Sequence, residues 1–67
     1  MTTLGENIIR LRKSKNWSQL ELANKLHVTR QAISNWERNK TTPDIETLEK
    51  LGEFFEVGIS GVLSGRH

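Results

Sequence analysis

The sequence predicts an all-α fold of five short helices, and three kinds of signal support this prediction. Thr3 and Ser18 each precede a glutamate by three residues, which is the pattern of a helix-starting capping box. Apolar residues recur at intervals of three and four, as they do on one face of an α-helix. The single proline, Pro43, cannot prolong a preceding helix and therefore marks a break in the chain.

The first helix is predicted to begin after the Thr3 cap and to end at about Ser14. Its core residues are expected to be Leu4, Ile8 and Leu11, which are spaced at i, i+4 and i+7. Basic side chains surround the end of this helix, where cations complement the helix dipole.

The second helix is predicted to begin after Ser18 and to end at Leu26, with Leu22, Ala23 and Leu26 on its apolar face. The small Ala23 leaves room for a neighbouring helix. His27 follows where a helix commonly ends in a left-handed residue, a conformation that histidine tolerates. Trp17 directly precedes the cap, and we expect it to pack as a hydrophobic staple between the first two helices.

The third helix is predicted to begin after a Thr29 cap and to run to about Arg38, with Asn39 as a left-handed stop. Its apolar face consists of Ala32, Ile33 and Trp36. About three residues separate the second helix from the third, and this short connection is typical of a helix-turn-helix.

The rest of the chain predicts two more helices and a tail. Asp44 caps a fourth helix that runs from Ile45 to about Phe55. Its expected apolar positions are Ile45, Leu48, Leu51, Phe54 and Phe55. A short fifth helix is expected at 59–63, and residues 63–67 are expected to fray, so that residues 1–67 form a single domain.

The outward face of the third helix is polar and consists of Arg30, Gln31, Ser34, Asn35 and Arg38. Gln and Asn can form two hydrogen bonds with an adenine edge, and Arg can do the same with guanine. Each such pairing is worth roughly 1–3 kcal/mol of discrimination between bases. An ordinary solvated helix face is the alternative, but the position of this face directly after the turn favours DNA binding.

The chain resembles the XRE-like helix-turn-helix domains of the phage repressor and Cro type. The matching segments are GENIIRLRK at Gly5–Lys13, WSQLELANKL at Trp17–Leu26, TRQAISNWERNK at Thr29–Lys40 and PDIETLEKL at Pro43–Leu51. Together they cover nearly the whole chain. The resemblance implies a compact, lambda repressor-like bundle of five short helices and the function of a transcriptional regulator, more commonly a repressor.

The same resemblance assigns roles to individual residues. It implies that Gln19 binds a phosphate and that Arg12 pairs with Glu37, which would tie the first helix to the third. The residues implied to face base edges or nearby phosphates are Thr29, Arg30, Gln31, Ser34 and Asn35, and those implied to approach the DNA backbone are Arg38, Lys40 and Thr41. His27 and Asn39 stand where this family frequently has glycine.

Charge is divided unevenly along the chain, whose net charge is +2. Residues 1–40 carry eight Lys/Arg and three Glu, a net charge of +5, whereas residues 41–67 carry two Lys/Arg and five Asp/Glu, a net charge of −3. The basic part contains the helix-turn-helix, which favours a polyanionic partner such as double-stranded DNA. Glu46, Glu49, Glu53 and Glu56 are interpreted as a solvated face, because their spacing does not match a metal-binding loop.

Other classes of function find little support in the composition. The chain has no cysteine and only two histidines, His27 and His67, which are far apart, so an enzyme or a metal centre is not expected. Neither a membrane partner nor a small-molecule ligand or cofactor is expected, because no apolar run approaches a bilayer span and no ligand pocket is evident. The expected location is the cytoplasm.

A homodimer on a palindromic operator is the expected functional form, because a single small module buries little surface on DNA. The predicted dimer surface comprises Val57, Ile59 and Val62. The alternative is that these apolar residues close the monomer core, which is the favoured interpretation for Leu63. A second hypothesis for the whole chain is an antitoxin-like protein-interaction module with secondary DNA binding.

Overall fold

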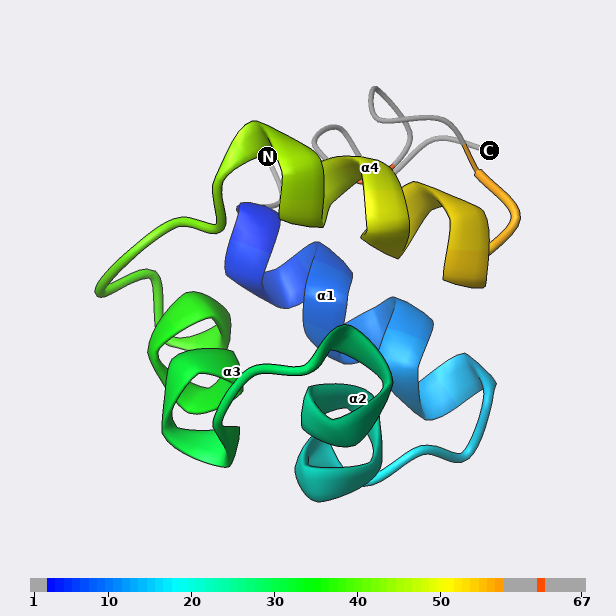
Figure 1. Cartoon of the computed structure of the whole chain (residues 1–67), viewed down its shortest axis with the longest axis horizontal. Helices are drawn as coiled ribbons and strands as arrows, with labels where there is room; N and C mark the ends of the chain where they lie inside the picture. Colours follow the sequence, from blue (N-terminus) through cyan, green and yellow to red (C-terminus); the bar gives the residue numbers. More distant parts are fainter. Residues whose placement is uncertain (1–2, 58–61, 63–67) are drawn as a thin grey trace.

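A computed structural model describes residues 3–57 and residue 62, and these residues contain four α-helices and no strand. The helices are α1 (Leu4–Ser14), α2 (Gln19–Leu26), α3 (Arg30–Glu37) and α4 (Ile45–Phe54). Helix α1 lies between α3 and α4 in the view of Figure 1, and α2 contacts both α3 and α4. The predicted fifth helix at 59–63 and the predicted tail at 63–67 lie outside the described residues, apart from Val62.

The two predicted capping boxes are both present. At α1 the Glu6 backbone N–H donates to Thr3 Oγ1 (3.1 Å), and the Thr3 N–H donates to Glu6 Oε1 (3.0 Å). At α2 the Glu21 N–H donates to Ser18 Oγ (3.0 Å), and the Ser18 N–H donates to Glu21 Oε1 (2.9 Å). Each box satisfies backbone donors that have no partner within the helix, and this local chemistry fixes where the helix begins.

The other two helices begin at single caps, as predicted. The Ala32 N–H donates to Thr29 Oγ1 (3.1 Å), and the Thr47 N–H donates to Asp44 Oδ1 (2.8 Å). Hydrogen bonds from Thr47 stabilise the ionised carboxyl of Asp44 and lower its pKa below the ordinary value. The larger contribution comes from the Thr47 side chain and the smaller one from its backbone N–H. The pKa of Glu6 is lowered in the same way by hydrogen bonds from Thr3, more by its backbone N–H than by its side chain.

Two left-handed residues stand where the sequence predicts them. His27 ends α2 with φ 58°, and Asn39 follows α3 with φ 60°. The Asn39 side chain also binds the start of α1, because the Gly5 N–H donates to Asn39 Oδ1 (3.0 Å) and Asn39 Nδ2 donates to Thr3 Oγ1 (3.0 Å). The end of α3 is therefore attached to the beginning of α1.

The core lies between the helices and contains apolar side chains from all four of them. Its buried members are Ile8, Leu11, Leu22, Ala23, Leu26, Ile33, Trp36, Leu48, Leu51, Phe55 and Val62. Apart from Val62, which was predicted as a dimer contact, these residues lie at positions predicted to face inward.

One core prediction is wrong, and several others hold in part. Ile45 is 62% exposed. It points about 90° around the axis of α4 away from the buried stripe of Leu48, Leu51 and Phe55. Leu4, Ala32 and Phe54 pack against the core as predicted but are only half-buried. Trp17 packs partly buried against the core, as predicted, but its ring also lies against the end of α4, 6.3 Å from Phe54 and 5.6 Å from Phe55, centroid to centroid.

None of the helices within the described residues is both long enough and apolar enough to cross a bilayer. The same part of the chain holds no group of three or more His, Cys, Asp or Glu side chains placed to bind a metal ion.

Candidate nucleic-acid interface

Helices α2 and α3 form the helix-turn-helix and are joined by a short, well-packed turn. The turn passes through left-handed His27, and the Val28 N–H donates to the Ala23 carbonyl oxygen (3.0 Å). Val28 packs partly buried against the core, and Ala23 is fully buried. The small side chain of Ala23 thus permits a close approach of the two helices, as the sequence predicts.

Helix α3 is also held by direct backbone contact with α1. A β-carbon at Gly5 would lie 2.5 Å from the Glu37 carbonyl oxygen and 2.6 Å from that of Trp36, distances at which atoms clash. Only glycine therefore allows the start of α1 to lie against the end of α3 in this geometry. The sequence interpretation missed this role, although a glycine inside an otherwise helical segment is a signal of close backbone approach.

A polar network that is largely buried joins three helices behind the outward face of α3. Arg12 Nε donates to Glu37 Oε2 (2.7 Å), Arg12 Nη2 donates to Glu37 Oε1 (3.2 Å), and Gln19 Nε2 donates to Glu37 Oε1 (2.9 Å). Arg12 Nη1 also donates to the carbonyl oxygen of Trp17 (2.8 Å). The side chains of Arg12 and Glu37 are only 12% and 5% exposed. The pair implied by the family resemblance is thus present as a two-pronged ion pair.

Gln19 extends this network to the surface. Its Oε1 accepts a hydrogen bond from Arg30 Nη1 (3.2 Å) while its Nε2 binds Glu37. The resemblance implies that Gln19 binds a phosphate, and the structure adds that Gln19 orients the first side chain of α3. Since an amide nitrogen carries two N–H groups, one remains for a phosphate oxygen.

A second set of hydrogen bonds runs along the outward face of α3. Gln31 Nε2 donates to Asn35 Oδ1 (3.1 Å), and Arg38 Nη2 donates to the same oxygen (3.3 Å). These three side chains lie on one face because they are spaced by four and three residues.

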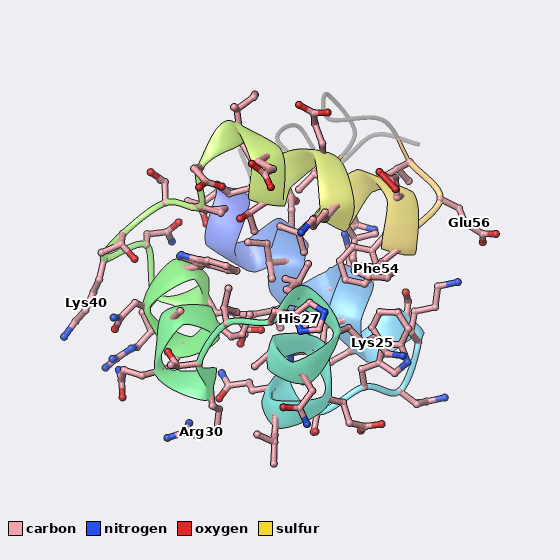
Figure 2. The ribbon with its side chains drawn as sticks, in the orientation of Figure 1. Lys25, His27, Arg30, Lys40, Phe54 and Glu56 are labelled. Carbon is pink, nitrogen blue, oxygen red and sulfur yellow. The ribbon has the colours of Figure 1, made fainter. Side chains whose placement is uncertain are left out.

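The predicted DNA-binding residues lie around this face with different exposures. Thr29, Arg30, Gln31, Arg38, Lys40 and Thr41 are exposed, and Gln19, Ser34 and Asn35 are half-buried. Figure 2 shows Arg30 and Lys40 projecting from the same side of the molecule, near the two ends of α3, whereas Phe54 and Glu56 lie on the other side.

The division of charge along the chain is also a division in space. Helix α4 exposes Glu46, Glu49 and Glu53. It lies across α1 from α3 (Figure 1). Exposed basic residues stand at the two ends of α3, Arg30 at its start and Lys40 just after its end. A polyanion approaching the α3 side therefore meets positive charge and stays away from the acidic helix.

The predicted dimer residues are placed differently from the expectation. Val62 is fully buried, and its carbonyl oxygen accepts a hydrogen bond from Asn7 Nδ2 (3.0 Å). It therefore completes the monomer core, which was the alternative interpretation, and is not a surface contact. Val57 is half-buried against the core, and Ile59 lies outside the described residues.

Residues 8–62 match the model of the helix-turn-helix protein family. The chain belongs to this helix-turn-helix family. It is 45% identical over 61 residues to the HTH-type transcriptional activator BcrR of Enterococcus faecalis, an alignment that covers 91% of this chain and 30% of that protein.

Two solved structures agree with the fold of this helix-turn-helix chain. A crystal structure of the P22 c2 repressor with a synthetic operator has a TM-score of 0.90 and 32% identity, and covers 97% of this chain and 98% of that one. A crystal structure of SinR with DNA has a TM-score of 0.80 and 36% identity, and covers 90% of this chain and 97% of that one. The predicted repressor-like all-α fold is therefore confirmed, and the chain spans 59% of full-length SinR of Bacillus subtilis.

Proposed function

We propose that this chain binds double-stranded DNA in a sequence-specific manner by inserting α3 into the major groove, and that it thereby regulates transcription. The observation that carries the proposal is the outward face of α3, where polar and basic side chains gather on a helix that the buried Arg12–Glu37–Gln19 network ties to α1 and α2. The similar P22 c2 repressor and SinR structures both include DNA, which supports the same use of the fold.

The proposed contacts fall into two groups according to the chemistry that each side chain offers. Gln31, Ser34 and Asn35 lie on the outward side of α3 and are proposed to contact base edges. The residues proposed to contact phosphates, or base edges next to them, are Gln19, Thr29, Arg30, Arg38, Lys40 and Thr41. This function is binding without chemistry and takes place in the cytoplasm.

The proposed functional form is a homodimer on a palindromic operator. One module of this kind buries only about 600–1,000 Å² on DNA, whereas two modules related by a two-fold axis contact half-sites about 34 Å apart. We place the dimer contact in the last third of the chain, around Val57 and Ile59. Repression is the proposed outcome, because it requires only that the bound dimer cover the promoter, whereas activation also requires a contact with polymerase.

Measuring DNA affinity as a function of salt concentration tests the proposal. The logarithm of the affinity is expected to fall linearly with the logarithm of the salt concentration, with a slope of about −0.9 per phosphate contacted. Lys40→Ala is expected to weaken binding to all duplexes alike and to make the slope shallower by about 0.9 for each phosphate that the variant no longer neutralises. Gln31→Ala is expected to reduce the preference for the operator over other duplexes.

An exposed acidic position on α4 provides the matched control, because Glu49→Ala changes charge on the side away from α3. Glu49→Ala is expected to leave the salt dependence of DNA affinity and the base preference unchanged. If the α3-side variants leave DNA affinity untouched but abolish binding to a protein partner, the chain is an interaction module and the DNA proposal is wrong.

A further inference from the structure

Three side chains on the outward face of α3 form one hydrogen-bonded unit centred on Asn35. Gln31 Nε2 and Arg38 Nη2 both donate to Asn35 Oδ1, at 3.1 Å and 3.3 Å. Asn35 is half-buried between two exposed neighbours, so its amide lies close to the helix surface. The unit is internal to this face and is separate from the buried Arg12–Glu37–Gln19 network behind it.

The partners of Asn35 fix which way its amide points. The guanidinium of Arg38 has only donors, so the Asn35 atom that it contacts must be the carbonyl oxygen. Gln31 contacts that same oxygen and must therefore present its amide nitrogen. With two donors bound, both lone pairs of Asn35 Oδ1 are occupied, whereas its amide nitrogen keeps two N–H groups.

We propose that this unit makes Asn35 a donor-only contact for the DNA base that it meets, so that the operator carries guanine at that position. The inference rests on the proposed DNA-binding function and names the base-edge chemistry that the same site selects. Guanine offers two adjacent acceptors, N7 and O6, in the major groove, and these match the two N–H groups of Asn35. Thymine offers one acceptor, O4, and ranks second.

The same arrangement disfavours the other two bases. The usual pairing of asparagine with adenine needs its carbonyl oxygen to accept from adenine N6, but in this chain that oxygen already accepts two hydrogen bonds. Cytosine presents an N4 donor, which would face the Asn35 donors with no acceptor between them. Asn35 therefore behaves differently from an isolated asparagine, and Gln31 and Arg38 act as the residues that position it.

The experiment selects bound duplexes from a random library with the wild-type chain and then measures affinity for all four bases at each operator position. Asn35→Ala identifies the position that Asn35 contacts, because the preference disappears only there. At this position the wild type is expected to prefer guanine over adenine by about 5- to 150-fold, the range expected for one good base contact.

Two further variants test the positioning. Asn35→Asp keeps an oxygen for Gln31 and Arg38 but replaces the outward donors with an acceptor, so the preference is expected to move from guanine to cytosine. The double variant Gln31→Ala/Arg38→Ala frees Asn35 Oδ1 and is expected to move the preference at the same position from guanine to adenine. Circular dichroism checks that both variants, which alter the helix surface, keep the wild-type helix content.

The outcomes separate this inference from the proposed function. A wild-type chain that shows no base preference at any position would overturn DNA recognition as a whole. A wild type that selects an operator, but with adenine or cytosine opposite Asn35, overturns the donor-only assignment and leaves DNA binding intact. An unchanged guanine preference in the double variant overturns the role of Gln31 and Arg38 as positioning residues.

Discussion

At the scale of single residues, Gly5 decides how closely α1 and α3 approach. A β-carbon there would meet two carbonyl oxygens of α3 at 2.5 and 2.6 Å. Gly5→Ala is therefore expected to lower the free energy of unfolding by about 1–3 kcal/mol, the usual cost of overpacking. Without the clash, alanine in a helix would raise the free energy of unfolding by about 0.5–1 kcal/mol. Urea denaturation therefore tests the close contact by the sign of the change, and an increase would contradict it.

The two left-handed residues next to the recognition helix are expected to respond differently to the same substitution. His27→Gly removes the steric cost of a left-handed side chain and is expected to raise the free energy of unfolding by up to about 1 kcal/mol. Asn39→Gly gives the same relief but removes the hydrogen bonds to Gly5 and Thr3, and a net decrease of about 1 kcal/mol is expected. Thermal melts of the two variants measure the difference, and equal changes in stability would show that the hydrogen bonds of the Asn39 side chain do not stabilise the fold.

At the scale of the helices, the starts could be predicted from the sequence because capping is local chemistry. Ser18 and Asp44 bind backbone groups three residues away, so the sequence contains all that the cap needs. The position of Trp17 against α4 could not be predicted, since it depends on contacts between residues far apart in the chain. The amide orientation of Asn35 was also beyond the sequence, because it depends on which rotamers its neighbours adopt.

The caps also predict how stability depends on pH. The pKa of Asp44 is lowered in the folded state, so the unfolded state binds a proton more readily. The stabilisation is therefore complete above the ordinary value of 3.8 and is lost as the pH falls through the lowered folded pKa. In melts between pH 7 and pH 2, Asp44→Asn is expected to show a weaker loss of stability in acid than the wild type, because asparagine caps equally well but does not titrate. Identical acid profiles would contradict this.

The buried ion pair determines how α1, α2 and α3 are held together. Glu37→Leu leaves the guanidinium of Arg12 buried without its partner, and the free energy of unfolding is expected to fall by about 3–5 kcal/mol. The double variant Arg12→Met/Glu37→Leu removes both charges and is expected to be more stable than the single variant. Chemical denaturation followed by tryptophan fluorescence measures the stability of both variants. A double variant as unstable as the single one would mean that lost packing, and not the unpaired charge of Arg12, causes the loss of stability.

At the scale of the whole molecule, the sequence already contained the division between a basic helix-turn-helix and an acidic remainder. The structure turns this division into two sides, because α1 lies between the acidic α4 and the recognition helix α3 (Figure 1). The predicted contribution of Val62 to a dimer surface was wrong for a physical reason, since a small core needs every apolar side chain that it can bury. An apolar residue alone does not distinguish a core position from an interface.

The most direct test of the central claim, that the outward face of α3 recognises a DNA sequence as part of a dimer, is selection of bound duplexes from a random library. The expected result is one enriched motif with two-fold symmetry, whose half-site centres are about 10 base pairs apart. Asn35→Ala is expected to abolish the preference at one symmetric pair of positions and to keep the rest. Recovery of duplexes without any enriched motif would contradict the claim.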